Sequence, residues 1–245
     1  MKNISMNFWA AACLLVLCGC GSAGRRAGKG CPEGMLAYWN FNEKPEAGRP
    51  PEFLNGPAWY SEGRAGSGLE MQNSGYALFQ HLTALDSLEK VTVEAWIKYR
   101  TLDHSNSGAR VFCKGPSACL TIGGPGNSVN NLSVFVDGTS PADWRRGYAS
   151  VTPDEWHHVA FTFDGARIKI YLDGRLDAAL AAPGRMVNDP AKPGIIGWDP
   201  YAVVGYHSPL DGYIDEVAVY GRPLPAEELE AHYRLGLKGK GYCAD

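Results

Sequence analysis

Four Asp-Gly dipeptides beside alternating apolar runs constrain the fold of this chain more than any other feature. They occupy positions 137–138, 164–165, 173–174 and 211–212. In residues 167–172, Ile168, Ile170 and Leu172 alternate with Arg, Lys and Tyr, which is the two-residue period of a strand. Asp-Gly follows at once and tolerates the positive φ angles of a tight hairpin turn. Residues 91–100 alternate in the same way, so the pattern predicts antiparallel strands joined by hairpins.

A short helix is expected directly after the last strand-like run. Pro225 suits a first helical position, Leu229 and Tyr233 form an apolar stripe, and Glu230 and Arg234 form an i,i+4 pair. No Ser, Thr or Asp stands where a cap is expected, so we expect a weakly held N-terminal end. The predicted fold class is all-β: a two-sheet antiparallel sandwich with one short C-terminal helix.

The first nineteen residues have the pattern of a lipoprotein signal peptide. Lys2 precedes an apolar segment, residues 8–17, that is too short to span a bilayer. Residues 17–20, Leu-Cys-Gly-Cys, resemble a bacterial lipobox, in which Cys20 becomes the acylated mature N-terminus. An ordinary secretory signal is the alternative interpretation. The expected organisation is therefore a signal peptide over 1–19, an acylated cysteine with a flexible tether over 20–30, and one domain over 31–245.

Acylation at Cys20 would decide where the protein resides. Several acyl chains anchor a protein stably to a membrane. We therefore expect a bacterial cell-envelope location with the membrane as a partner through the N-terminal lipid. Gly21 resembles the residue that directs lipoproteins to the outer membrane, provided that the cell has two membranes.

The four cysteines that follow Cys20 predict disulfides. They form an even set, which suits an oxidising compartment, and they allow three pairings. Cys113 and Cys119 flank a Gly-Pro turn and can face each other across a hairpin. Cys31 and Cys243 then pair and join the start of the domain to its end. Metal binding is the alternative, but the spacings match no zinc pattern.

Four segments resemble the laminin-G-like, concanavalin-A-like jelly-roll family found in many bacterial surface and secreted proteins. They are MLAYWNF at 35–41, VTVEAWIKYR at 91–100, EWHHVAFTFDG with IYLDGRL at 155–176, and GYIDEVAVYGRPLPAEELEAHY at 212–233. The resemblance implies a jelly roll of two facing antiparallel sheets. It also implies a lectin-like, adhesive or scaffold role, with a calcium ion in some members.

The histidines and the last carboxylates are interpreted as structural. Strand alternation places His157 and His158 on opposite faces, so they cannot share a metal. Asp215 is expected on the face of Val217 and Val219 and at least partly buried, with Glu216 on the opposite face. Related endoglucanases carry Glu-x-Asp-x-x-Glu on one strand, and that motif is absent from this sequence. We therefore expect no enzyme activity.

A calcium site is a weaker prediction. Asn40 and Asn42 follow an early strand-like segment, and Asp215 belongs to the last one. First and last strands are often neighbours in this fold, and calcium prefers carboxylate and amide oxygens. Calcium is therefore the one cofactor considered. The alternative is that these side chains cap turns.

Two aromatic clusters are the candidate ligand-binding residues. Sugar rings stack on flat side chains while polar neighbours take their hydroxyls. One cluster contains Trp198, Tyr201, Tyr206 and His207, and the other contains Trp144 and Arg145, with Arg146 and Tyr148 close by. Either cluster can line a shallow site at the rim of the sandwich. The alternative is that the rings cap the core beneath long loops.

Charge and composition limit the class of partner. The formal net charge is −3 and no basic cluster exceeds the Arg145-Arg146 pair, so nucleic acid is not expected. The predicted function is that of a lipid-anchored binding module for carbohydrate or for an extracellular or envelope protein. A structural or assembly module without a small ligand is the alternative, and a glycoside hydrolase comes third.

Overall fold

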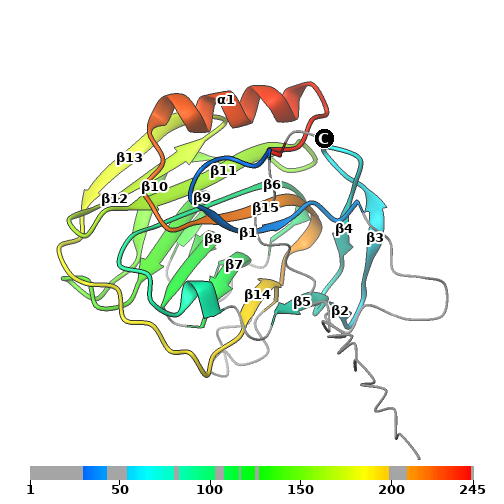
Figure 1. The fold of residues 1–245 in the computed structure, drawn as a ribbon. Helices are drawn as coiled ribbons and strands as arrows, with labels where there is room; N and C mark the ends of the chain where they lie inside the picture. The colour runs from blue at the N-terminus through cyan, green and yellow to red at the C-terminus, as the bar shows by residue number, and fades with distance from the viewer. Residues whose placement is uncertain are drawn as a thin grey trace, which may run out of the picture.

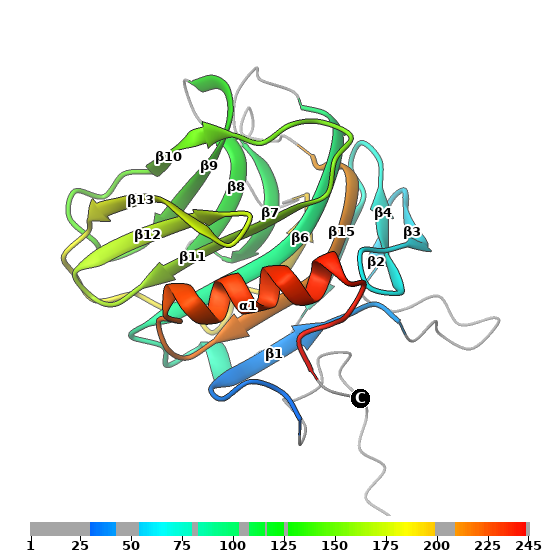
Figure 2. The ribbon, with the colours of Figure 1, turned by 90° about the horizontal axis from the view of Figure 1, so that it is seen from above.

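Fifteen β-strands and one α-helix make up the part of the chain that the structure, a computed structural model, describes. The described residues are 30–42, 54–79, 83–102, 108–115, 117–124, 127–198 and 209–243. The strands form two antiparallel sheets that face each other, and helix α1 (Ala226–Leu237) lies on the outer face of one of them (Figures 1 and 2). This arrangement confirms the predicted jelly-roll sandwich with one short C-terminal helix.

The sheet that α1 covers, which we call the helix-side sheet, has the strand order β13-β12-β11-β6-β15-β4-β3, and β1 also pairs with β15. Its strands are β1 (Met35–Trp39), β3 (Ala58–Glu62), β4 (Ser67–Met71), β6 (Val91–Thr101), β11 (His157–Phe163), β12 (Arg167–Leu172), β13 (Arg175–Ala181) and β15 (Asp211–Tyr220). The long strands β6 and β15 pair with each other at its centre.

The second sheet, which we call the distal sheet, has the order β10-β9-β8-β7-β14-β5-β2. Its strands are β2 (Leu54–Asn55), β5 (Tyr76–Phe79), β7 (Ala109–Lys114), β8 (Ala118–Gly124), β9 (Asn127–Val136), β10 (Arg145–Ser150) and β14 (Gly194–Gly197). A single 3₁₀ turn, Thr83–Leu85, precedes β6 in the described chain.

The main hydrophobic core fills the space between the two sheets. The alternation predicted for residues 91–100 holds, because Val91, Val93, Ala95, Ile97 and Tyr99 all belong to this core. Apolar residues of β8 and β9 meet them from the distal sheet. Each fully buried large apolar side chain contributes about 1.5–3 kcal/mol relative to an exposed one, so this layer dominates the stability of the fold.

Three of the four Asp-Gly dipeptides form turns as predicted. Asp173 and Gly174 have φ angles of 51° and 71° and join β12 to β13, which is the backbone of a tight two-residue hairpin. The prediction for residues 211–212 is wrong, because Asp211 and Gly212 are the first two residues of β15. The Asp211 carboxylate instead accepts hydrogen bonds from Arg100 on the neighbouring strand, at 2.8 and 3.0 Å.

Helix α1 packs on the outer face of the helix-side sheet through a second, smaller apolar cluster. Leu229 is buried in it, and the ring of Tyr233 stacks on Trp96 of β6 at 5.6 Å between centroids. The helix begins after Pro225 with no side-chain cap, and Glu230 pairs with Arg234 on its exposed face, as predicted. None of the helices in the described ranges is long and apolar enough to cross a membrane.

Two disulfides connect the pairs that the sequence analysis favoured. Cys31 is bonded to Cys243, which lies beyond α1, and Cys113 of β7 is bonded to Cys119 of β8. The first bridge therefore holds the start of the domain against its C-terminal end. The predicted signal peptide, Cys20 and the tether up to residue 29 lie outside the described residues.

Candidate ligand-binding face

A row of polar side chains crosses the outer face of the distal sheet. In spatial order from β10 to β7, this polar row consists of Arg146, Ser133, Thr121 and Arg110, each paired with the next across neighbouring strands. Residues paired in this way project from the same face of a sheet. The adjacent Leu120 and Val134 face the core, so the polar row faces away from it.

Aromatic rings lie beside the polar row. The guanidinium carbon of Arg110 is 5.7 Å from the centroid of the Trp144 ring, within the range of a cation–π contact. Trp144 also packs against Phe135 at 5.6 Å, and both rings are partly exposed. Tyr148, two residues after Arg146, is 77% exposed. Within the polar row, Thr121 and Ser133 are 0% exposed and Arg110 is 7% exposed, so the accessible part of this face consists of the aromatic rings and the partly exposed Arg146.

Trp198 reaches the same face from β14. It follows Gly197, which is paired with Arg110, and its ring lies 5.6 Å from that of Tyr76. Tyr76 alternates with the core residue Ala77 along β5 and therefore faces outward. Trp144 and Trp198, one residue from each predicted cluster, thus lie on one face of the distal sheet. Tyr201, Tyr206 and His207 lie outside the described residues.

Arg145 differs from its predicted role in the binding cluster. It is only 7% exposed, and its guanidinium donates hydrogen bonds to the carbonyl oxygens of Ala181, Asp143 and Pro141 at 3.0, 2.7 and 3.0 Å. These contacts tie the start of β10 to the end of β13. Because these three bonds occupy the guanidinium of Arg145, we leave Arg145 out of the candidate face, to which the neighbouring, partly exposed Arg146 belongs.

Sequence reasoning missed the centre of the face. Arg110 and Thr121 each have apolar neighbours on both sides in the sequence, and Ser133 lies in a longer polar-apolar run. Register shifts at Arg110–Phe112 and after Ile122 break strict alternation there. The sequence feature that could have identified this face is an arginine inside an apolar run, because a buried arginine needs a polar partner or a functional role.

The candidate calcium residues lie around one turn between β3 and β4. Asp215 Oδ2 accepts the backbone N–H groups of Arg64 and Ala65 at 2.8 and 2.9 Å. Asn42 Oδ1 accepts the N–H of Ser67 at 2.6 Å, and Asn40 Oδ1 accepts that of Asn42 at 3.3 Å. Within the described ranges, no three His, Cys, Asp or Glu side chains gather as a metal site. The contacts fit the turn-capping interpretation, and calcium stays a prediction.

The predicted orientation of Asp215 is wrong because β15 contains a bulge. The register against β6 shifts between Asp215 and Ala218, and Glu216 has a φ of 52°. Asp215 is paired with Trp96 of the helix-covered face, whereas Val217 lies in the core between the sheets. Glu216 also turns toward the helix side, where it contacts Tyr38 and Tyr242. Both carboxyl groups are fully buried there.

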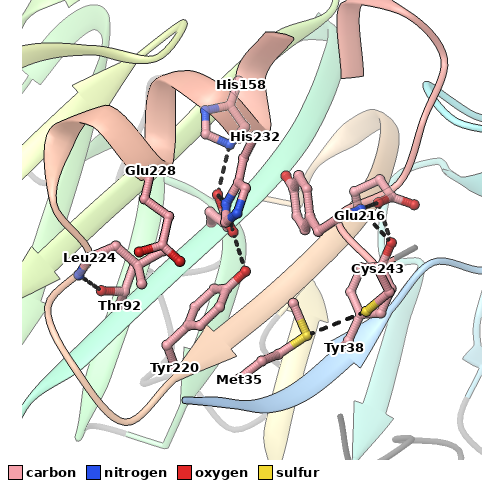
Figure 3. Close-up of polar contacts among 12 residues, drawn as sticks. Met35, Tyr38, Thr92, His158, Glu216, Tyr220, Leu224, Glu228, His232 and Cys243 are labelled. Carbon is pink, nitrogen blue, oxygen red and sulfur yellow. Dashed lines mark hydrogen bonds and ion pairs between the residues drawn. The ribbon is translucent and has the colours of Figure 1, made fainter. Parts of the chain in front are cut away.

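A buried glutamate connects α1 to the helix-side sheet. Figure 3 shows His158, His232 and Tyr220 converging beneath the helix, and all three bind the carboxylate of Glu94 on β6. The distances to its oxygens are 3.0 Å from His158 Nε2, 2.9 Å from His232 Nδ1 and 2.6 Å from the Tyr220 hydroxyl. Since His232 belongs to α1, this Glu94 cluster is a polar attachment point within an otherwise apolar interface.

The Glu94 cluster favours an ionised carboxylate. Burial opposes the charge, but the hydrogen bonds from His158 and His232 outweigh it and lower the pKa of Glu94 to about 2. For His232, burial lowers the pKa, and the bond to Glu94 outweighs that effect, so that the pKa is raised. Burial together with the Glu94 charge raises the pKa of Tyr220 far above its ordinary value. His157 is bonded to Asp173 at 2.9 Å and to Thr152 at 2.7 Å, so both adjacent histidines have the structural contacts predicted for them.

The carboxyl pair at the bulge favours a retained proton. Burial, reinforced by neighbouring negative charge, raises the pKa of both Asp215 and Glu216 above their ordinary values. Three backbone N–H groups donate to Asp215, which suits its ionised form. Glu216 Oε1 has no hydrogen-bond partner in the described chain, so the geometry places the proton on Glu216.

We expect the domain to lose stability as the pH rises from about 4.5 to 8. In this range an unfolded glutamate is ionised while the folded pair keeps a proton, so the folded state binds more protons and rising pH favours unfolding. A raised pKa of His232 acts in the same direction above pH 6.5. The loss should be about 2–3 kcal/mol, or roughly 5 °C in Tm. Thermal unfolding at several pH values checks it. Glu216→Gln should flatten the slope, whereas Glu230→Gln on the exposed face of α1 should leave it unchanged.

These carboxylates are poorly placed for catalysis. Glu94, Asp215 and Glu216 are all 0% exposed and lie between the sheet and the segment formed by α1 and the C-terminal residues. A glycosidase needs two carboxyl groups on either side of a substrate in an open site. These three carboxyl groups instead contribute to the packing beneath α1 and the C-terminal residues. The candidate surface for a ligand is on the distal sheet.

Comparison with known proteins places the fold in one family. The family model described as the concanavalin A-like lectin/glucanases superfamily matches residues 71–230. Comparison with curated protein sequences gives no match.

Several solved structures have a similar fold. One is domain 4 of a GH43 extracellular arabinanase from Geobacillus stearothermophilus in complex with arabinotriose, with a TM-score of 0.54 and 22% identity over 72% of this chain and 81% of that chain. Another is the CBM40 of the Ruminococcus gnavus IT-sialidase bound to alpha2,3 sialyllactose, with a TM-score of 0.53 and 17% identity over 67% and 95% of the two chains. A putative carbohydrate binding protein from Bacteroides ovatus has a TM-score of 0.52 and 19% identity over 64% of this chain but only 44% of its own. Because all three identities are 22% or lower, the similarity shows a shared fold only.

Proposed function

Because this chain belongs to the concanavalin A-like lectin/glucanases superfamily, we propose that it is a lipid-anchored, non-catalytic carbohydrate-binding module of the bacterial cell envelope. The observation that carries the proposal is the outer face of the distal sheet. There the partly exposed Trp144, Trp198 and Arg146 combine ring surfaces with hydrogen-bond donors, which is the chemistry that sugars require. Two proteins of similar fold hold arabinotriose and sialyllactose in their structures, which agrees with a glycan ligand.

The position of the chain ends supports the proposed anchor. Cys31 and Cys243 pack with the cluster beneath α1, on the side of the molecule opposite the outer face of the distal sheet. Residues 20–30 would span at most about 40 Å when fully extended. A domain held by acylated Cys20 through this tether can therefore direct the candidate face away from the membrane. In a two-membrane cell, Gly21 favours the outer membrane.

One experiment on the full chain tests both the carbohydrate binding and the lipid anchor. We expect the wild-type protein to sediment with membranes and, after extraction in detergent, to bind a defined class of glycans on an array. Trp144→Ala should weaken that binding at least tenfold, because a buried aromatic ring contributes about 1.5–3 kcal/mol. Trp59→Ala is the matched control, since Trp59 is 39% exposed on β3 of the other sheet. Cys20→Ser should release the protein from the membrane fraction.

Each part has its own contradicting outcome. Absence of binding to every glycan by folded protein, with calcium and with chelator, would contradict carbohydrate recognition and leave a protein partner to be sought. Equal loss in Trp144→Ala and Trp59→Ala would contradict the assigned face. Membrane association that survives Cys20→Ser would contradict the lipid anchor. Loss of binding only with chelator would establish the predicted calcium requirement.

A further inference from the structure

We propose that one end of the outer face of the helix-side sheet contacts the lipid headgroups of the membrane that holds the anchor. The inference rests on the proposed anchor at Cys20 and adds a second contact with the same membrane, which orients the domain. It is carried by a row of partly exposed aromatic side chains, by a lysine within that row, and by the place where the tether joins the domain.

Five side chains form a row across the helix-side sheet. In spatial order from β11 to β3, this aromatic row consists of Trp156, Lys98, Tyr213, Glu70 and Trp59. The last four are paired in register across β6, β15, β4 and β3, and Trp156 directly precedes β11, which pairs with β6. Residues paired in this way project from the same face of a sheet. The row therefore spans five neighbouring strands.

The aromatic row faces away from the core. The residues that alternate with it along the strands, Ile97 and Tyr99 on β6, Ile214 on β15 and Leu69 on β4, belong to the core between the sheets. Figure 2 looks onto the outer face and shows β6, β15 and β4 extending past α1. All five side chains of the row are partly or fully exposed, so this end of the sheet is open to a partner.

Three of the five side chains are aromatic. Trp59 is 39% exposed, and the rings of Trp156 and Tyr213 are 6.2 Å apart. Tryptophan and tyrosine favour the boundary between lipid and water, because each ring has an apolar body and one polar group. The indole N–H of Trp59 is already bonded to Glu70 at 3.1 Å, so the exposed part of this ring is apolar. Such a surface suits the headgroup region of a bilayer.

Lys98 places a free cation between two of the rings. Its Nζ lies 4.5 Å from the Tyr213 ring centroid and 5.7 Å from that of Trp156. It has no ion-pair partner in the described part of the chain. Lysine is a compact cation that binds phosphate groups, and every phospholipid headgroup carries one. The ammonium is therefore placed to meet a headgroup while the rings lie beside it.

The other charges near Lys98 do not oppose this contact. Arg100 pairs with Glu70 and with Asp211 at 2.8 Å each. Lys98 offsets the second of these two acids, so the centre of the row is neutral although the whole chain has a formal net charge of −3. A neutral patch avoids the repulsion that an acidic surface meets at an anionic leaflet.

The end of α1 adds apolar surface beside the row. A Cβ atom added to Gly236 would meet the indole of Trp96, which lies on the same face of β6 two residues before the row. The next residue, Leu237, is 52% exposed, and Lys238 and Lys240 after it are exposed as well. An exposed leucine followed by two lysines is a further match to a lipid surface, because long lysine side chains reach the headgroups while apolar groups lie deeper.

The tether joins the domain on this same face. Cys31 is bonded to Cys243, and both pack against the apolar cluster beneath α1 that includes Trp96. Two residues of strand, about 7 Å, separate Trp96 from the aromatic row. Residues 20–30 would span at most about 40 Å when fully extended. A chain acylated at Cys20 can therefore bring the row to the bilayer that holds its acyl chains.

This contact orients the domain but does not replace the anchor. Even a single acyl chain binds a membrane only marginally and reversibly, and a few surface side chains bind less strongly. Cys20→Ser is therefore still expected to release the protein. With the row on the membrane, the outer face of the distal sheet points away from it, toward a glycan ligand.

The test uses the full acylated chain, purified in detergent and reconstituted into phosphatidylcholine vesicles. Half of the preparations contain lipids brominated near the headgroup, since bromine quenches tryptophan fluorescence only at short range. We expect the wild-type protein to be quenched, and Trp59→Phe should reduce the quenched signal about twofold, because Trp59 is the most exposed ring of the row. Trp144→Phe on the distal sheet is the matched control and should leave the quenched signal unchanged.

A second pair of variants tests the lysine. Lys98→Gln should reduce quenching of the remaining tryptophans about twofold, because the row loses its contact with the headgroup phosphate. Lys192→Gln is the matched control, since Lys192 is exposed just before β14 of the distal sheet. Thermal unfolding shows whether each variant is folded, and flotation with vesicles shows whether it is anchored.

The outcomes separate this inference from the proposed function. Equal quenching of anchored wild type and Trp59→Phe would overturn the contact and leave the lipid anchor standing. A larger loss in Trp144→Phe than in Trp59→Phe would show that the distal sheet faces the membrane, which overturns the orientation. An equal effect of Lys98→Gln and Lys192→Gln would overturn the role of Lys98. Failure of the acylated chain to float with vesicles would overturn the proposed anchor itself.

Discussion

Replacing Glu94 with leucine should lower the free energy of unfolding by about 3–5 kcal/mol, the range for breaking a buried ionic contact by removing one partner. The substitution leaves His158, His232 and the Tyr220 hydroxyl without their shared acceptor in a site that water does not reach. Since a domain of this kind is stable by about 5–15 kcal/mol in total, the variant should unfold at much lower urea concentrations.

The loss of stability depends on whether the residue that replaces Glu94 can still accept hydrogen bonds. Glu94→Gln keeps the shape and one acceptor oxygen, so its cost should be smaller, about 1–3 kcal/mol. Glu230→Gln is the matched control, because Glu230 pairs with Arg234 on the exposed side of α1, the helix that Glu94 holds. An ion pair in such a position contributes about 0–1 kcal/mol. Urea denaturation followed by tryptophan fluorescence measures all three variants.

We also predict which part of the domain Glu94→Leu loosens first. Because His232 is the polar contact that joins α1 to Glu94, loss of that contact should first loosen the helix. Hydrogen exchange should therefore rise in residues 226–237 of Glu94→Leu more than in the strands of the distal sheet. A loss below 1 kcal/mol in Glu94→Leu, or a loss equal to that in Glu230→Gln, would contradict the assigned role of the cluster.

Sequence patterns predicted the parts of this fold that are decided locally. The alternation of β6 and the Asp173-Gly174 turn were readable because a strand period and a two-residue hairpin need only neighbouring residues. The disulfide between Cys113 and Cys119 followed for the same reason, since the two cysteines flank one turn. The pairing of Cys31 with Cys243 then followed because two cysteines remained.

Features that depend on contacts between distant strands were not readable. Glu94 and Arg110 are each flanked in sequence by apolar residues, yet one lies beneath a helix and the other lies under a tryptophan. Their surroundings come from residues far along the chain, His232 for Glu94 and Trp144 for Arg110. The bulge at Glu216 exchanged the face of Asp215, because one extra residue reverses the alternation that the prediction assumed.

Removing the bridge between Cys31 and Cys243 should destabilise the domain about twice as much as removing the other bridge. In the loop-entropy model, the cost of losing a disulfide grows with the length of chain that it closes, and the two separations are 212 and 6 residues. The model gives upper values of about 5 and about 2 kcal/mol. Paired serine substitutions at each bridge, compared by urea denaturation under oxidising conditions, measure the two losses.

Local contacts strengthen this difference. The hairpin of β7 and β8 is held by its backbone ladder on both sides of Cys113 and Cys119, so its ends stay close without the bond. Cys31 and Cys243 belong to no strand of the described chain, and the N–H of Tyr242 binds buried Glu216 at 3.1 Å. Loss of the terminal bridge should therefore also let water reach Glu216, lower its pKa and weaken the pH dependence of Tm. Equal losses for the two bridges, or an unchanged pH dependence, would show that β1 and α1 hold the chain ends without the disulfide.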